Sequence, residues 1–523
     1  MTNDNHTTSR RELLKAGAAG AILLGGQGLL PTRESAVGRL ATPSAIRPRR
    51  GGQLRVAMTG GGSSDTLDAQ ALVSLPDQAR ILQLYNSLVE FDLDAKLKMS
   101  LAEEITPNAA ATEWTVRLRP GIEFHNGKLL TADDLIFSFQ RIMNPKSPKP
   151  GAAQLSLLDY KRLKKIDNRT VRFPFTSPFS PFVQLLADYY YFVVPVGYDP
   201  QRPVGTGPFK YKSFTPGQQS VFVRNDRYWE SGLPYVDEVI ISDFTDETSQ
   251  INGLLSGQVD AIESLSATSV SALQSQGQKV LISKTGSYTP ITMRVDVAPF
   301  NDVRVRQALR YVIDREQMLK LVFGGYGQIG NDLFSLYDPD YDHGIPQRTQ
   351  ELDRAKALLK SAGHSGLHVS LTSSPIAAGV TLCAQVFAEQ ARGAGITVDI
   401  QSVTPTDMFG LNYLKWPFAF DTWPAIYFLT NVGEGQVPGS PYNESHFSNP
   451  RFTQLYNQAL RTVNPVTQRE IIHEMQTIYW NEGGYIIPYF TPAIDAHSPK
   501  LQGVTPGREL SLSNFGFKTF WFA

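Results

Sequence analysis

The sequence of 523 residues contains a single cysteine, Cys383. One thiol excludes an internal disulfide and a zinc site built from cysteines. Basic and acidic residues number 49 each, so the formal net charge is zero and gives no electrostatic reason to expect a nucleic-acid partner. No long apolar run follows the first 30 residues, which excludes a further membrane-spanning helix. We therefore expect a soluble mature protein.

Sequence patterns of catalysis are also missing. Neither H-E-x-x-H nor G-x-S-x-G occurs, and the eight histidines lack the spacing of a metal site. Gly325–Gly330 matches G-x-G-x-x-G, but a predicted helix precedes it where a dinucleotide site requires a strand. Cys383 falls on an apolar helix face, which favours an inert thiol in a core. The sequence thus predicts no catalytic residue, no metal ligand and no cofactor.

The N-terminal residues have a pattern typical of export. Arg10 and Arg11 stand before an uncharged run of Ala, Gly and Leu that is too short for an ordinary membrane span. The segment Ser9–Lys15 resembles a twin-arginine signal; the alternative is an amphipathic helix with a chance arginine pair. We predict a signal peptide over 1–38 and a linker over 39–52. No cysteine follows the apolar run, so we expect no lipid anchor.

The rest of the chain alternates strand and helix patterns. Period-two alternation predicts a half-buried strand near 114–118. Apolar residues at helical spacing predict one helix over 301–319, capped by Asn301 or Asp302. A helix at 380–391, with Leu382 and Cys383 inward, separates two strands that should therefore be parallel. The remaining predicted elements are helices at 131–143, 450–461 and 466–481 and strands at 51–58, 368–371 and 396–400.

Several segments after residue 52 resemble one protein family. The most recognisable is 100–142, which contains F-H-x-G-x-x-x-x-A-x-D from Phe124 to Asp133. The other segments, in the family's order, are 84–92, 204–214, 224–229, 257–262, 299–316, 351–363 and 485–490. Together they resemble the solute-binding proteins of ABC importers in family 5, which contains the periplasmic dipeptide-, oligopeptide- and nickel-binding proteins.

The resemblance implies an α/β, two-lobed periplasmic-binding-protein fold with a hinge and an extra α/β domain inserted in the first lobe. The first lobe is expected over 53–87, 203–287 and 486–523, the inserted domain over 88–202 and the second lobe over 288–485. Ligand should shift an open–closed equilibrium toward the closed form. The resemblance further implies a periplasmic monomer that captures a small molecule or short peptide, delivers it to an ABC permease and ATPase complex at the inner membrane and binds no nucleic acid.

Candidate ligand-binding residues come from the family's ligand-contacting segments in the first lobe, the insert and the second lobe. They are Ser63, Ser64, Asp65, Phe179, Ser180, Tyr288, Gly325, Tyr326, Gly327, Trp416, Asp421, Trp423 and Tyr427. Capping of the following helix is an equal alternative for the first three, and core packing is the alternative for the aromatic residues.

One departure from the family bears on the ligand. Peptide-binding relatives have a Trp followed closely by an Asp that pairs with the peptide's amino terminus, whereas no carboxylate follows Trp423. Asp421 precedes Trp423, and the direction in which the Asp421 side chain points depends on the strand register. Because a buried ammonium without a partner is costly, we hypothesise that the protein does not hold a free amino terminus in the usual way. The clustered aromatic residues would then stack on a sugar, a blocked peptide or an apolar ring.

Several functions remain open at this point. The favoured one is a non-enzymatic receptor for a peptide or peptide-like solute. Alternatives are the same receptor role for a saccharide, an opine-like conjugate or a metal chelate. Two further alternatives belong to other functional classes. One is an exported hydrolase, and the other is a binding protein that delivers its ligand to a sensor.

Overall fold

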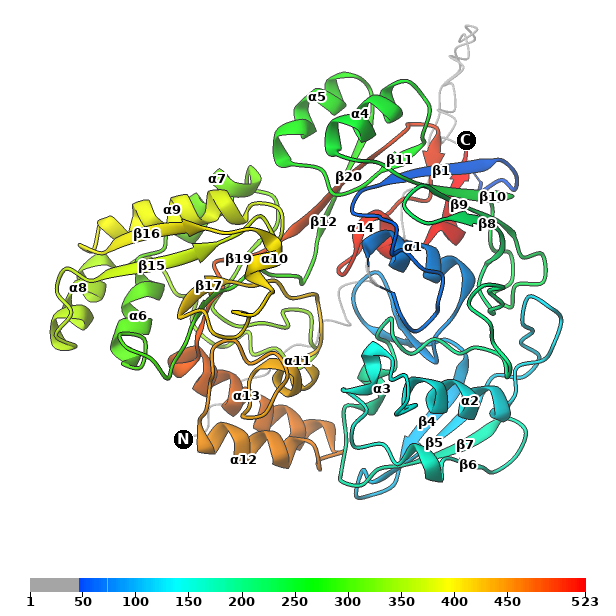
Figure 1. Ribbon diagram of the computed structural model, residues 1–523, viewed down its shortest axis with the longest axis horizontal. Helices are drawn as coiled ribbons and strands as arrows, with labels where there is room; N and C mark the ends of the chain where they lie inside the picture. The colour runs from blue at the N-terminus through cyan, green and yellow to red at the C-terminus, as the bar shows by residue number, and fades with distance from the viewer. Residues whose placement is uncertain (1–46, 73) are drawn as a thin grey trace, which may run out of the picture. The chain divides into compact units, whose positions relative to one another are not determined.

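The computed structural model describes residues 47–72 and 74–523, so the predicted signal peptide and most of the predicted linker lie outside the described residues. The largest sheet has seven strands from distant parts of the chain (Figure 1). In spatial order they are β12 (Lys279–Lys284), β20 (Pro492–His497), β11 (Ala261–Ile262), β1 (Gln53–Met58), β10 (Glu238–Asp243), β9 (Gln219–Arg224) and β8 (Phe209–Thr215). Strand β1 is parallel to β10 and β11, and the other pairs are antiparallel. All seven lie in segments predicted to form the first lobe.

Short helices accompany this sheet. They are α1 (Leu75–Leu84), α4 (Glu247–Leu255), α5 (Val270–Ser275) and α14 (Ser511–Asn514). Helix α1 begins after Ser74, whose hydroxyl accepts a hydrogen bond of 3.2 Å from the backbone N–H of Asp77. This cap satisfies one of the helix's unpaired N–H groups.

A four-stranded antiparallel sheet lies within the predicted insert. Its spatial order is β4 (Ala102–Pro107), β5 (Glu113–Leu118), β7 (Thr170–Pro174) and β6 (Lys164–Lys165). Helices α2 (Ala132–Ile142) and α3 (Phe182–Leu185) and the hairpin of β2 (Val89–Phe91) and β3 (Leu97–Met99) complete the segment. As predicted, Trp114, Val116 and Leu118 are buried. Asp134 accepts hydrogen bonds from the backbone N–H and hydroxyl of Thr131, which confirms the predicted helix start.

The third sheet has five strands and lies in the predicted second lobe, with its last residue just beyond. Its order is β16 (Thr397–Ser402), β15 (His368–Ser373), β17 (Phe418–Phe420), β13 (Ile291–Met293) and β18 (Tyr485–Ile486). Strands β15 and β16 are parallel, as the strand–helix–strand order predicts. Helix α9 (Val380–Arg392), which joins them, lies along both (Figure 1).

Seven further helices and two short strand pairs accompany this sheet and the chain's end. The helices are α6 (Val303–Tyr311), α7 (Arg315–Phe323), α8 (Leu352–Ser361), α10 (Pro405–Met408), α11 (Phe428–Gly435), α12 (Pro450–Ala459) and α13 (Pro465–Glu482). The strand pairs are β14 (Gln328–Ile329) with β19 (Tyr489–Phe490), and β21 (Leu501–Gln502) with β22 (Trp521–Phe522).

Two details of this region differ from the sequence-based prediction. The single helix expected over 301–319 is two helices, because the chain breaks after Tyr311 and Asp314 caps a new helix by accepting a hydrogen bond of 2.9 Å from Gln317. Leu382, expected to face inward, is 41% exposed. It lies at the edge of the apolar face of α9, one residue from the buried Cys383.

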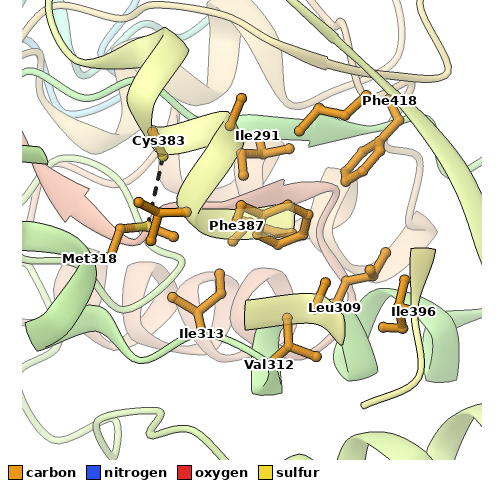
Figure 2. Packing of buried hydrophobic residues seen from close by; sticks show 14 of the residues in the cluster. Ile291, Leu309, Val312, Ile313, Met318, Cys383, Phe387, Ile396 and Phe418 are labelled. Carbon is orange, nitrogen blue, oxygen red and sulfur yellow. Dashed lines mark hydrogen bonds between the residues drawn. The ribbon is translucent and has the colours of Figure 1, made fainter. Parts of the chain in front are cut away.

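The core beneath α9 accounts for the cysteine. Cys383 is fully buried, and its Sγ lies 3.7 Å from Sδ of Met318 among Phe387, Ile313 and Leu309 (Figure 2). Burial raises the pKa of the thiol to about 12. The predicted position of the thiol in an apolar core is therefore confirmed, and its low reactivity stays a prediction.

The glycines at 205 and 207 permit a close approach of two chain segments. A Cβ on Gly205 would lie 2.0 Å from the carbonyl oxygen of Leu84. The imidazole of His125 spans the same turn: Nδ1 accepts from the backbone N–H of Gly205 at 3.2 Å, and Nε2 lies 3.1 Å from the carbonyl oxygen of Gly207. Burial lowers the pKa of His125 to about 4, so it acts here as a neutral hydrogen-bonding group.

Two adjacent stretches connect the seven-stranded and five-stranded sheets. The chain passes from β12 to β13 and returns from β18 to β20. Between them, the backbone N–H of Thr491 donates to the carbonyl oxygen of Ser287 at 2.8 Å, and the hydroxyl of Thr285 donates to the carbonyl oxygen of Thr491 at 2.8 Å. Two crossings side by side are the arrangement that a hinge requires; the hinge and the lobe boundaries stay predictions.

Candidate functional site

One cavity among the described residues has a volume of about 450 Å³. One wall comes from the predicted insert, at 150–157, 179–181 and 185–190. The opposite wall comes from the predicted second lobe, at 409–442 and 456–460. This volume falls within the range of small-molecule sites, which are often found where two domains meet.

Aromatic and acidic side chains dominate the lining. The aromatic residues are Phe179, Tyr189, Tyr190, Phe409, Tyr413, Trp423, Tyr442 and Tyr456. The acidic residues are Asp188, Asp421 and Glu434, and no Lys, Arg or His is found among the described residues that line the cavity. Aromatic faces and carboxylates both attract positive charge, so the lining favours a cationic ligand with an apolar body.

Asp421 stands at one end of this lining, between strand β17 and Trp423. Its Oδ1 accepts a hydrogen bond of 2.7 Å from the backbone N–H of Thr422, and its carboxylate also bonds to Tyr413. Burial raises the pKa of Asp421 despite these two bonds. A ligand cation would remove that penalty by supplying the missing countercharge.

Glu444 lies behind Asp421 and is the second buried carboxyl group at this end of the cavity. Its Oε1 accepts hydrogen bonds from Nε1 of Trp423 at 2.8 Å and from the hydroxyl of Tyr485 at 2.5 Å. Its Oε2 has no hydrogen-bond partner and is buried beside Asp421 and Tyr413 around a space of about 10 Å³. Burial, followed by the charge of Asp421, raises the pKa of Glu444.

Asp188 and Glu434 form a second acidic pair in the lining. Nε2 of Gln154 donates to Oε1 of Glu434, and the side chain of Gln154 also bonds to Asp188. Burial raises the pKa of Asp188 to about 7, and burial followed by the charge of Asp188 raises that of Glu434 to about 8. Neither carboxyl group of the pair has a positively charged partner among the described residues that line the cavity.

The structure brings Phe179, Asp421 and Trp423 together at this cavity. Ser63 and Ser64 are exposed and do not line it. Asp65 is buried, and its Oδ2 lies 2.7 Å from Nη1 of Arg80, so the carboxylate serves a buried ionic network. As ligand contacts, these three first-lobe residues stay predictions.

Ser180 and Tyr427 connect the predicted insert to the predicted second lobe. The hydroxyl of Ser180 donates to the carbonyl oxygen of Ala459 at 2.9 Å and accepts from Nε2 of Gln468 at 2.8 Å. The hydroxyl of Tyr427 donates to the carbonyl oxygen of Ala95 at 2.8 Å, and its ring borders a smaller cavity of about 50 Å³. Both residues lie near the site but are already paired within the protein.

The remaining candidates lie away from the main cavity. Tyr288 is buried in the core, where its hydroxyl accepts a hydrogen bond of 2.9 Å from Asn431. Gly325, Tyr326 and Gly327 form the turn between α7 and β14, and Gly327 has φ 97° and packs against the carbonyl oxygen of Phe490. Trp416 donates from Nε1 to the carbonyl oxygen of Met408 at 3.1 Å.

Sequence reasoning missed Asp188, Glu434 and Gln154. The run of three tyrosines that follows Asp188 is the one available signal, because aromatic residues gather at binding sites. Glu434 has no such signal, since a glutamate on a predicted helix is ordinarily a solvated side chain. The position of Glu434 in the cavity lining depends on the tertiary fold, which places helix α11 opposite the predicted insert.

The described residues have neither a membrane-spanning helix nor a metal site. No helix in the described part of the chain has the length and apolarity to cross a membrane. Within the same residues, no three His, Cys, Asp or Glu side chains are grouped so that they would hold a metal ion.

The α/β sheets, together with the cavity between the predicted insert and the predicted second lobe, indicate a ligand-binding protein. The model of the family "bacterial extracellular solute-binding proteins, family 5" matches residues 96–433. The chain therefore belongs to this family, as the sequence motifs indicate.

Relatives agree with that assignment. The chain is 28% identical over 464 residues to di/tripeptide-binding protein 2 of Pseudomonas aeruginosa, with 80% of this chain and 86% of the relative covered. It is 24% identical over 482 residues to heme-binding protein A of Haemophilus influenzae, with 84% and 86% covered. The crystal structure of the ABC transporter substrate-binding protein CtaP of Listeria monocytogenes superposes with a TM-score of 0.81 at 18% identity, with 91% of this chain and all of that chain covered. These likenesses confirm the two-lobed α/β fold of a periplasmic binding protein.

Proposed function

We propose that the protein captures a peptide or peptide-like solute and delivers it to an ABC permease and ATPase complex. The observation that carries the proposal is the position of Asp421, whose carboxylate lines the cavity beside Trp423. The hypothesis that a free amino terminus finds no partner depended on the absence of a carboxylate after Trp423. Asp421 supplies one from the other side of the tryptophan, so we assign it to the ligand's amino group. The di/tripeptide-binding relative supports the same ligand class.

Calorimetric titration of the mature protein with short peptides tests the proposal. We expect the Asp421→Asn variant to bind a peptide with a free amino terminus about 30-fold more weakly or worse, because losing one partner of a buried charge pair costs about 2 kcal/mol or more. Acetylation of the peptide's amino terminus should weaken binding to the native protein similarly. The exposed Asp353→Asn variant is the control. Equal affinity for free and acetylated peptides would contradict the assignment.

The lining bears on every ligand that carries a carboxylate. An opine-like conjugate, a chelate of net negative charge and a peptide with a free carboxyl terminus would each have a carboxylate without a basic side chain in the described lining. The lining therefore does not separate these classes, and the carboxyl end of a bound peptide must lie outside it. Since the family consists of binding proteins, we also propose that the chain is a monomeric receptor without enzymatic activity and without a nucleic-acid partner.

We further propose that the protein reaches the periplasm by twin-arginine export and is not lipid-anchored. The proposal rests on Arg10 and Arg11 and on the absence of a cysteine after the apolar run; these residues lie outside the described part of the chain. Replacement of both arginines by lysine should move the protein from the periplasmic to the cytoplasmic fraction. Unchanged export would contradict the twin-arginine route.

A further inference from the structure

The second acidic pair, Asp188 and Glu434, is joined by one neutral group. The amide nitrogen of Gln154 donates to Glu434, the same side chain bonds to Asp188, and Oε1 of Gln154 lies 2.5 Å from the hydroxyl of Tyr191. Asp188 also accepts a hydrogen bond of 2.6 Å from the backbone N–H of Tyr189. Two carboxyl groups from distant segments therefore lie at one side chain, and the donors that hold them in the described part of the chain are neutral.

Asp188 and Glu434 have each other's charge nearby but no positive charge to offset it in the described lining. Like charges in a partly buried setting repel, and a neutral amide offsets only part of that repulsion. Each buried carboxylate in the ion pairs of Asp65, Asp68 and Asp332 has an arginine partner. At Asp188 and Glu434, by contrast, no cationic side chain is found among the described residues that line the cavity. Other buried carboxyl groups, such as Asp338 and Asp495, are also held by neutral donors; what distinguishes Asp188 and Glu434 is that they line the cavity.

The two acidic pairs are separate features of the same cavity. The charge that raises the pKa of Glu444 is that of Asp421, whereas the charge that acts on Glu434 is that of Asp188. Glu444 also retains a buried oxygen without any partner beside Asp421. The cavity therefore has carboxyl groups at two separate places, and a ligand with one amino group would pair with only one of them.

The walls beside Glu434 suit the stem of a long basic side chain. Tyr190, Tyr442 and Tyr456 line the cavity, and their rings offer apolar faces to methylene groups and negative faces to a cation. An ammonium or guanidinium donates several hydrogen bonds at once, which is what two carboxylates at one side chain accept.

We propose that Asp188 and Glu434 form a second cation subsite, so that the preferred ligand is a peptide with a basic side chain in addition to its amino terminus. This inference rests on the proposed function, because it adds a contact to the peptide that Asp421 receives. It specifies net positive charge as the property by which the site selects among peptides.

The test compares three tripeptide amides, Ala-Lys-Ala, Ala-norleucine-Ala and Ala-Glu-Ala, by calorimetric titration. Lysine and norleucine have side chains of similar shape but differ in charge. We expect the lysine peptide to bind at least tenfold more tightly than the norleucine peptide, and the glutamate peptide to bind most weakly. In the Glu434→Gln variant, which keeps the shape and the acceptor for Gln154, the lysine preference should fall at least fivefold while norleucine affinity changes little. The exposed Glu389→Gln variant is the control and should retain the full preference.

The outcomes separate this inference from the proposed function. Equal binding of the lysine and norleucine peptides, with Asp421→Asn still weakening both, would overturn the cation subsite and leave the peptide receptor in place. A lysine preference that Glu434→Gln does not reduce would also overturn it. Failure of all three peptides, together with binding of 1,5-diaminopentane that Glu434→Gln weakens, would overturn the peptide receptor and support the subsite.

Discussion

Binding of a cationic peptide should displace protons from the acidic pair, and the number follows from the structure. With pKa values of about 7 for Asp188 and about 8 for Glu434, the unliganded protein at pH 7 holds about 0.5 and about 0.9 of a proton at these two groups. A cation beside a carboxylate lowers its pKa by about 1–3 units. Complete displacement would therefore release about 1.4 protons.

Because of the peptide's amino group, net proton release at pH 7 should become net proton uptake at higher pH. An α-amino group with a pKa of about 8 is about 90% protonated at pH 7, so pairing with Asp421 takes up only about 0.1 proton there. Asp421, whose pKa is raised to about 6, releases about 0.1 proton in the same step and cancels that uptake. At pH 9 the amino group takes up about 0.9 proton, and the acidic pair has only about 0.1 left to release. We expect net release of about 1.4 protons at pH 7 and net uptake of about 0.8 at pH 9.

The assay is calorimetric titration of the Ala-Lys-Ala amide in phosphate, HEPES and Tris buffers, whose ionisation enthalpies differ. The slope of observed enthalpy against ionisation enthalpy gives the number of protons exchanged. Tyr190, the neighbouring phenol, has its pKa raised to about 12 and does not titrate in this range. Glu434→Gln should reduce the release at pH 7 by about 0.9 proton. No exchange at pH 7, or a slope that Glu434→Gln leaves unchanged, would refute the reasoning.

Three further predictions concern the fold. Asp332→Asn should destabilise the protein by about 3–5 kcal/mol in chemical unfolding, because Arg315 and Arg348 lose their shared buried partner; a loss below about 1 kcal/mol would contradict this. Gly205→Ala should cost about 1–3 kcal/mol through the clash with Leu84, whereas Gly62→Ala, with open space around its Cβ, should be near neutral; equal effects of the two variants would contradict the close approach. A thiol reagent such as DTNB should modify no cysteine in the folded protein and one equivalent in denaturant, and rapid modification of the folded protein would show that Cys383 is accessible.

Local features of the fold could be predicted because they depend on neighbours in sequence. The capping of α2 needs only Thr131 and Asp134, three residues apart, and the parallel pair β15–β16 follows from one strand–helix–strand unit. The break before α7 was missed although Asp314 is a common capping residue, because the apolar periodicity continues through Ile313. The local apolar pattern allows either one helix or two, and tertiary packing decides between them.

The candidate site could be predicted only in part. Asp421 and Trp423 lie in a segment that resembles the family's ligand-contacting region, so the sequence directs attention to them. Asp188 and Glu434 are far apart in the chain and are joined through Gln154, whose contact depends on how the insert meets helix α11. No local pattern encodes a contact of that kind.

The position of the second pair relates ligand charge to closure. Asp188 belongs to the predicted insert and Glu434 to the predicted second lobe, and at pH 7 the two groups together hold about 1.4 protons while the cavity is empty. A ligand cation that replaces those protons would contact both walls and so favour the closed form of the proposed hinge. A shift from 1% to 99% closed requires about 5.5 kcal/mol of differential binding. Removing one partner of a buried charge pair costs about 2–5 kcal/mol, part of which is the penalty of leaving the other charge unpaired, so the ligand's side-chain cation would supply only part of that energy. A neutral peptide would occupy the same cavity through Asp421 and the aromatic walls while leaving the protons in place. Selection by charge and selection for the closed form would then be one physical event at Asp188 and Glu434.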